Sequence, residues 1–299
     1  MRNLMIILSL IIFTSISNAQ EAVFKFMPPN GISYTETLKK TVEKNFGNLR
    51  DDIEISESKA KISITKNGKE YLMVATPIEI KGTKNGQRVD NPIVNLPLNR
   101  KITYRINENG EIKSIEGYES LIKDLKESIP SEFQNALIQK LFNPEAMINR
   151  EIEEWYGRVG GFVGQKVSEG DRWYSESEFA LPTGGTIKYF IVTEFSKIWI
   201  EGSKKLVKIN YINDTDAGAM KQLFEDMSKS LSKDYQIPLI QTDKPSMSAG
   251  GERIIDANTM LFQSEKSWRV MTMKLTVPGQ DEVFSTVKET RGYSFQYKY

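Results

Sequence analysis

Three Asn-Gly pairs that each lie between two β-rich runs constrain the fold more than any other feature of the sequence. They lie at 67–68, 85–86 and 109–110, and each joins two runs rich in β-branched and alternating apolar residues. Asn and Gly both tolerate the positive φ angles of tight hairpin turns, so such a pair between β-rich runs is a strong hairpin signal. We therefore expect the region from Ala22 to Ser114 to consist mostly of antiparallel strands.

Four segments show the apolar spacing of an amphipathic helix instead. They span 118–129, 131–142, 144–155 and 215–231. In the first, Tyr118, Leu121 and Ile122 recur at intervals of three or four residues, which places them on one helix face. The glycine-rich stretch YGRVGGFVGQ at 156–165 follows the third segment and predicts a linker.

The second half of the chain returns to strand patterns. Strands are predicted at Trp173–Ala180, Thr186–Ile200 and Leu206–Ile212, a loop at 237–251, and a last tight turn at 277–280. Because each helix has a single apolar stripe, it must cover another apolar surface. The sequence therefore predicts the α+β class, with curved antiparallel sheets and amphipathic helices packed on their inner face.

The chain divides into two β-rich halves. Residues 20–156 form an N-terminal half with three helices, and residues 165–299 form a C-terminal half with one long helix. The motif F-x-x-P-x-G begins at Phe26 and at Phe179, and I-[N/D]-x-N begins at Ile106 and at Ile255, at similar offsets. These matches indicate a duplicated unit. One continuous domain is the alternative.

The first nineteen residues have the three parts of a secretory signal peptide. Arg2 precedes an apolar run from Leu4 to Phe13, and Ser17-Asn18-Ala19 supplies the small residues of a cleavage site. Because no cysteine follows the run, we expect no lipid anchor. No later stretch is apolar enough to span a membrane as a helix. The sequence predicts a secreted protein of the periplasm or the extracellular space, with no transmembrane span.

Composition lowers the expectation of catalysis. The chain is free of cysteine and histidine, so it has neither the thiolate nor the imidazole that nucleophilic and transition-metal chemistry most often use. Its 40 basic and 39 acidic residues leave no electrostatic footprint for nucleic acid. We expect no metal, no cofactor, no nucleic-acid partner and no catalytic residue.

The stretch VSEGDRWYSES offers the best alternative to this view. Asp171, Glu176 and Glu178 could form a carboxylate cluster, which would make the protein a hydrolase of envelope glycans. However, strand alternation places both glutamates on one face, away from Trp173. We therefore expect a turn followed by a strand, with Trp173 as a core anchor.

Aromatic residues provide the candidate binding site. In the C-terminal GYSFQYKY, Tyr293, Phe295, Tyr297 and Tyr299 alternate and so share one face of a strand. Such rings either fill a core or line a pocket for an apolar ligand such as an acyl chain. The candidate ligand-binding residues are Tyr293, Phe295, Tyr297, Trp268 and Met271.

The V-x-x-G-D-x-W motif at Val167–Trp173 and the run of hairpins resemble uncharacterised exported bacterial envelope proteins that are known as a domain of unknown function. The β-rich chain with amphipathic helices also resembles half-barrel proteins that carry lipids or lipoproteins. The resemblance implies a non-catalytic binding protein of the cell envelope, with a lipid, another apolar ligand or an envelope protein as its partner.

Overall fold

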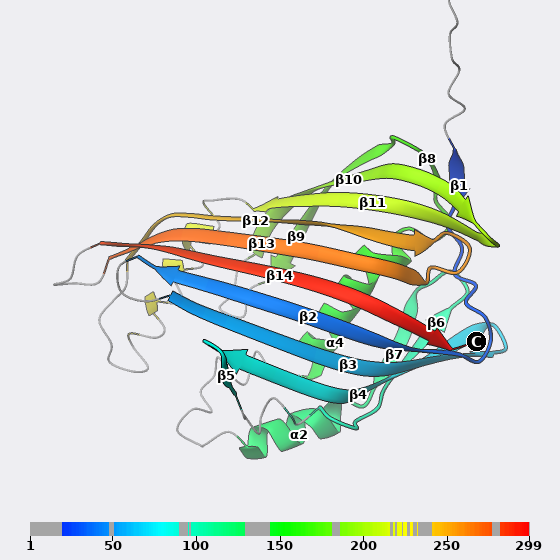
Figure 1. The fold of residues 1–299 in the computed structure, drawn as a ribbon, viewed down its shortest axis with the longest axis horizontal. Coiled ribbons are helices and arrows are strands. Elements are labelled where there is room, and N and C mark those ends of the chain that lie inside the picture. Colours follow the sequence, from blue (N-terminus) through cyan, green and yellow to red (C-terminus); the bar gives the residue numbers. More distant parts are fainter. Residues whose placement is uncertain are drawn as a thin grey trace, which may run out of the picture.

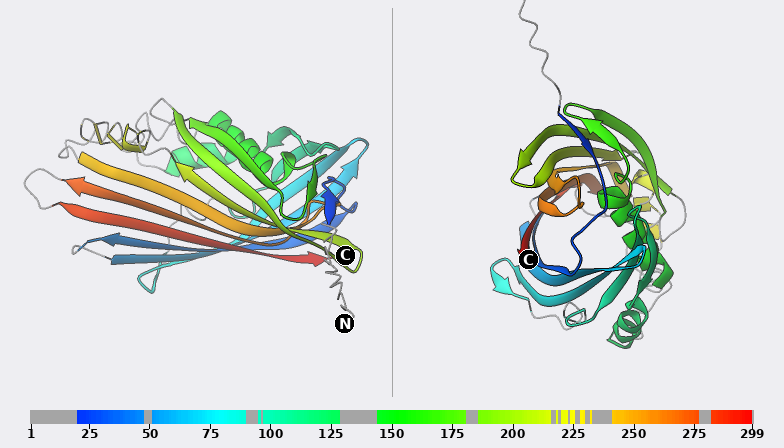
Figure 2. Two further views of the ribbon diagram at one scale, coloured as in Figure 1. Left: turned by 90° about the horizontal axis from the view of Figure 1, so that it is seen from above. Right: turned by 90° about the vertical axis from the view of Figure 1, so that its right-hand side faces the viewer.

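The fold is dominated by one antiparallel sheet that is strongly curved, with a concave inner side (Figures 1 and 2). The computed structural model describes residues 20–47, 51–89, 97–128, 144–180, 186–215, 241–276 and 282–298, with isolated positions at 95 and between 218 and 232. In this part of the chain, no helix is long and apolar enough to cross a membrane.

The described elements are fourteen strands and three short helical segments. The strands are β1 (Glu21–Val23), β2 (Ile32–Phe46), β3 (Asp51–Asn67), β4 (Glu70–Lys84), β5 (Gln87–Arg88), β6 (Ile102–Asn107), β7 (Ile112–Glu116), β8 (Lys166–Ser168), β9 (Arg172–Ala180), β10 (Thr186–Glu201), β11 (Lys204–Thr215), β12 (Gln241–Asp256), β13 (Phe262–Thr276) and β14 (Val283–Lys298). The helical segments are α2 (Tyr118–Ser128), α4 (Pro144–Trp155) and the π-helical turn η2 (Tyr156–Gly160).

Strands β1 and β8 pair in a small sheet of their own, and the other strands of both halves join in one large sheet. Its order is β7-β6-β4-β3-β2-β14-β13-β12-β11-β10-β9, with β5 paired to β4. Each half is a meander of sequential hairpins, and the two meanders meet where β2 pairs with β14, with Tyr34 opposite Tyr297. The predicted duplication of the two halves stays a prediction.

The predicted α+β class is wrong, because the fold is mostly β. The long strands extend well beyond the short helices, which do not form a layer over the sheet (Figure 1). Apolar periodicity identifies helices one at a time. It does not measure how much of the sheet surface the helices cover. The α+β class was predicted because the helices were assumed to cover most of it.

Individual elements were predicted more successfully than the class. Helices at 118–129 and 144–155 are confirmed as α2 and α4. Residues 131–142 and about half of 215–231 lie outside the described residues, and the positions described between 218 and 229 are helical. All three Asn-Gly turns are confirmed, with a positive φ at Gly68, Gly86 and Gly110. The strands predicted at 173–180, 186–200 and 206–212 correspond to β9, β10 and β11.

Two segments that were predicted as irregular are ordered parts of the fold. The predicted loop at 237–251 contains the first half of β12, in which Pro245 lies at a register shift between Asp243 and Ser246. A bulge accommodates proline because no ladder hydrogen bond is required there. The predicted linker contains η2, and its Val159 and Phe162 are buried.

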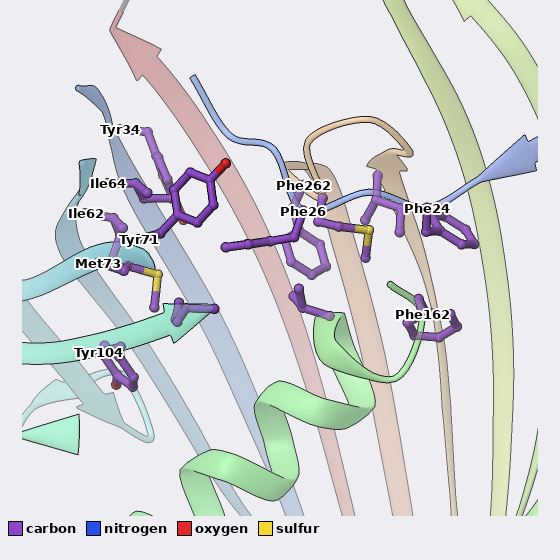
Figure 3. Close-up of a cluster of buried hydrophobic side chains, with 14 of the residues drawn as sticks. Phe24, Phe26, Tyr34, Ile62, Ile64, Tyr71, Met73, Tyr104, Phe162 and Phe262 are labelled. Carbon is purple, nitrogen blue, oxygen red and sulfur yellow. The ribbon is translucent and has the colours of Figure 1, made fainter. Parts of the chain in front are cut away.

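The main core is a cluster of buried side chains at one end of the curved sheet, and Figure 3 shows it in close-up. The segment before β2 crosses this end and inserts Phe24 and Phe26, which are 0% and 3% exposed. Its backbone is held by hydrogen bonds from the amide of Phe24 to the carbonyl of Gln165 and from the amide of Lys25 to the carbonyl of Ala257, at 3.0 and 2.7 Å. The core therefore joins segments from both halves of the chain.

Candidate functional site

The inner side of the sheet contains a cavity of about 890 Å³ between η2 and strands β9–β12. On β10 and β11 the lining side chains alternate with outward ones, whereas β9 contributes four consecutive residues, from Trp173 to Glu176. Its lining comprises Ile152, Glu153, Glu154, Tyr156, Gly157, Arg158, Gly161, Phe162, Gln165, Trp173, Tyr174, Ser175, Glu176, Tyr189, Ile191, Thr193, Ile209, Tyr211, Asn213 and Arg253. Tyr156 and Tyr174, which are 65% and 74% exposed, mark its opening to solvent.

The wall next to the core is a cluster of aromatic rings. The indole of Trp173 stacks on Phe162 with ring centroids 5.8 Å apart and meets Phe195 edge-on at 4.6 Å. Phe195 is fully buried. The prediction that Trp173 is a core anchor is therefore confirmed, and its ring contributes to the cavity wall as well.

Segment η2 is fixed against the sheet by an arginine. The guanidinium of Arg158 donates from Nε and Nη2 to Oε2 of Glu265 on β13, at 3.1 and 2.6 Å. Its Cζ lies 4.9 Å from the ring centroid of Phe262 and 5.1 Å from that of Tyr293. Burial alone would lower the pKa of Arg158, but Glu265 and Glu36 outweigh it and raise that pKa. Arg158 is therefore a fixed cation.

A second arginine, which is more deeply buried, lies beside the first. Arg253 on β12 is 7% exposed, donates from Nη1 to the carbonyl oxygen of Gly157 at 3.1 Å, and places its Cζ 4.6 Å from the ring centroid of Tyr211. Its Nε lies 4.0 Å from Oε1 of Glu265, beyond hydrogen-bond distance. Glu265, which is 4% exposed, thus faces both arginines.

A further carboxyl group lies close to this pair. Burial raises the pKa of Glu36 on β2, and Arg158 only partly offsets the increase. Burial and the nearby Glu36 also raise the pKa of Tyr34. Burial therefore opposes the ionisation of both Glu36 and Tyr34.

The structure separates the predicted ligand-binding residues. Tyr293, Phe295, Tyr297 and Met271 occupy the inner face of β13 and β14, by the alternation that also places Glu265 inward. Phe295 stacks on Phe262 with centroids 5.7 Å apart, and the hydroxyl of Tyr297 donates to the carbonyl oxygen of Phe262. None of the four residues is among the cavity-lining residues, so their role in binding stays a prediction.

Trp268, the fifth candidate, lies on the outer face of β13. It is 38% exposed and borders a separate hollow of about 700 Å³, with Ile212 and Thr290. Because side chains alternate along β13, Trp268 and Met271 point to opposite faces of the sheet. Sequence proximity alone does not separate the two faces of a strand, so Trp268 was grouped with residues that it cannot meet.

The predicted acidic cluster is not assembled. Oδ2 of Asp171 accepts a hydrogen bond from the amide of Ser168 at 2.7 Å, which closes the turn before β9. Glu176 forms an ion pair with Lys188 at 3.3 Å, and the side chain of Glu178 lies outside the described residues. Among the described residues, no group of three or more acids could hold a metal ion.

Sequence reasoning missed Arg158, Arg253, Glu265 and Glu36. No short motif connects them, because they lie on η2, β12, β13 and β2 and meet only in the folded sheet. The one available signal was local: Val159, Phe162 and Val163 are apolar within the glycine-rich segment. A linker rarely needs such residues, and they indicate that Arg158 lies next to the core.

Solved structures show only distant similarity. Lipovitellin matches with a TM-score of 0.44 and 10% identity over 91% of this chain and 25% of its own, so this chain spans about a quarter of it. OccK5 of Pseudomonas aeruginosa matches with a TM-score of 0.26, 7% identity and coverage of 92% and 100%. A putative exported protein with YmcC-like fold from Bacteroides fragilis has a TM-score of 0.23, 9% identity and coverage of 89% and 97%. At these TM-scores the similarities support no functional argument.

No curated protein matches the sequence. Residues 50–192, from β3 to the middle of β10, match the family described as "Family of unknown function (DUF6263)", which confirms the predicted resemblance to a family of unknown function.

Proposed function

We propose that this chain is an exported cell-envelope protein that binds an apolar ligand on the concave inner side of its sheet and catalyses no reaction. The observation that supports this function is the cavity of about 890 Å³ between η2 and β9–β12. Pockets that bind small molecules have volumes of roughly 300–1,000 Å³ and mostly apolar linings. The cavity therefore has the size of a ligand site.

The lining suits a flexible hydrocarbon chain. Trp173, Ile191 and Ile209 present apolar groups from three strands, and Phe162 adds a ring from the segment after η2. Removal of each CH₂ of a ligand from water contributes about 0.8 kcal/mol, so even part of an acyl chain gains several kcal/mol in such a cavity.

The alternative, a carboxylate hydrolase of envelope glycans, has less support. Hydrolysis of a glycosidic bond needs two carboxyl groups that face one bond. Asp171 closes a turn and Glu176 pairs with a lysine, so these acids do not converge on a common point. We therefore propose no catalytic residue.

The binding function is tested by mass spectrometry of lipids that co-purify with the protein. Ile191→Trp places a large ring in the cavity, because Ile191 lines it. The matched control is Phe190→Trp, since Phe190 is the neighbouring residue of β10, points outward and is 53% exposed. We expect bound lipid in the wild type and in the control, and a strong loss in Ile191→Trp.

Two results would contradict the proposal. Absence of lipid from the native protein would exclude a stably bound lipid. Equal lipid content in Ile191→Trp and Phe190→Trp would place the ligand outside the cavity.

Export is tested separately. Cleavage after Ala19 predicts a mature protein that begins at Gln20, so N-terminal sequencing of the protein from the producing cell should read Gln-Glu-Ala-Val. An intact Met1 in the mature protein would refute a cleaved signal.

A further inference from the structure

The cavity contains a buried donor that has no hydrogen-bond partner. Nε of Arg253 finds no acceptor among the described residues, although the side chain is only 7% exposed. Buried polar groups are almost always paired, and an unpaired group costs about 1–3 kcal/mol, more if it is charged. A partner from outside the chain would remove this cost.

A second unpaired atom lines the same cavity. Oδ1 of Asn213 on β11 is buried and has no hydrogen-bond partner among the described residues. Asn213 and Arg253 are the two described residues with such an atom. Both residues line one cavity, so part of its wall is polar.

The deep part of the cavity is cationic. Arg158 and Arg253 line it, whereas Glu265, the acid that faces both, does not. The acids that do line it are Glu153, Glu154 and Glu176, and these are exposed. Glu265 is the buried carboxylate that faces both guanidinium groups. The exposed Glu154 also lies 3.8 Å from Nη1 of Arg158, whereas Nε of Arg253 has no acceptor within hydrogen-bond distance among the described residues.

The geometry restricts where a head group can bind. Nη1 of Arg253 is occupied by the carbonyl oxygen of Gly157, and the guanidinium lies against the ring of Tyr211. The carbonyl and the ring together fix the orientation of the guanidinium, and Nε is its unpaired donor. A planar carboxylate is the anion that best matches a fixed guanidinium.

We propose that the ligand of this cavity is a long-chain carboxylic acid, with its carboxylate at Arg253 and its hydrocarbon chain along Trp173, Ile191 and Ile209. The inference rests on the proposed function, since it names the head group of the apolar ligand. A single carboxylate would give Nε of Arg253 the charged acceptor that Glu265, at 4.0 Å, does not provide. The apolar strand residues then cover the tail.

The test compares two probes that have the same chain and different heads, palmitate and 1-hexadecanol, by isothermal titration calorimetry on the mature protein. We expect palmitate to bind at least about tenfold more tightly, because a charge-assisted hydrogen bond contributes about 1.5–3 kcal/mol. Arg253→Met should remove this preference, and Arg253→Lys should retain part of it. The matched control is Arg172→Met, since Arg172 is an exposed arginine that pairs with Glu194 on the outer face.

Each outcome separates the inference from the proposed function. Equal affinity of the wild type for both probes overturns the carboxylate head group and leaves apolar binding intact. Failure of both probes to bind refutes the proposed function itself. Binding of hexadecanol by Arg253→Met shows that this variant is folded. If Arg253→Met binds neither probe, the wild-type preference and the Arg253→Lys variant decide the question.

Discussion

The most demanding prediction concerns Glu265, the buried carboxylate that faces both Arg158 and Arg253. Glu265→Gln keeps the shape of the side chain and one acceptor oxygen but removes the charge that Arg158 and Arg253 both face. Removal of one partner of a buried ion pair costs about 3–5 kcal/mol, because the other charge remains buried. Glu154 still lies 3.8 Å from Nη1 of Arg158, so part of the compensating charge remains. We therefore expect the free energy of unfolding to fall by about 3 kcal/mol, the lower limit of this range.

The assay is equilibrium unfolding in urea at pH 7, followed by circular dichroism. For an m-value of about 3 kcal/mol per molar, the expected loss lowers the midpoint by about 1 M urea. The matched control is Glu194→Gln, which breaks the exposed pair with Arg172 and should leave the midpoint unchanged within error. A similar midpoint for both variants would refute the argument that Glu265 balances the two cations.

The remaining predictions use the same unfolding assay. Burial raises the pKa of Glu151, so the wild type should lose stability as the pH rises from below the usual glutamate pKa to above the raised one, and Glu151→Gln should reduce this loss. Burial opposes ionisation of Glu289 as well, but its three cationic partners outweigh it and lower that pKa. Glu289→Gln should therefore lower the free energy of unfolding at neutral pH and have little effect at a pH below the lowered pKa. If Glu151→Gln and Glu289→Gln changed the pH dependence of stability in the same way, the opposite pKa shifts of the two residues would be contradicted. Asn213→Leu should raise the free energy of unfolding by about 1 kcal/mol, because it removes an unpaired buried acceptor, and a loss would show that the acceptor is satisfied. Gly68→Ala should lower the free energy of unfolding by about 1–2 kcal/mol, because alanine is strained at the positive φ of this position. Gly110→Ala should lower it further, because the new Cβ would also lie 2.7 Å from a methyl group of Val163. Equal losses in the two variants would contradict this close approach.

Features that depend on neighbours in sequence could be predicted. The Asn-Gly turns, the two described α-helices and the alternation around Trp173 are local patterns, and the structure confirms them. Each is fixed by the conformational preferences of a few adjacent residues.

Features that depend on distant partners could not. Strand β12 contains Pro245, Gly250 and Gly251, which locally favour a loop, but its pairing with β11 and β13 holds it extended. The two glycines also have a packing role, because a Cβ at Gly250 would lie 2.9 Å from the ring of Trp268. A tertiary contact thus overrides the local preference.

The candidate site was the least predictable part. Alternation in β14 identified an inward row of aromatic side chains, but the cavity lies further along the sheet, beside β9–β12. Its arginines come from η2 and β12 and share an acid from β13. Nothing in the order of the residues along the chain specifies that the three side chains meet.

The pairing of β2 with β14 has a consequence for how the chain folds. The other strand pairs of the large sheet join neighbours along the chain or nearly so, and they can form as local hairpins, whereas this pair joins residue 33 to residue 298. Contacts between residues so far apart require closure of a long loop and form slowly. The two meanders should therefore form first, and their union at β2 and β14 should limit the folding rate. Until that step, both strands expose unpaired edges, and the chain would then be most prone to aggregation.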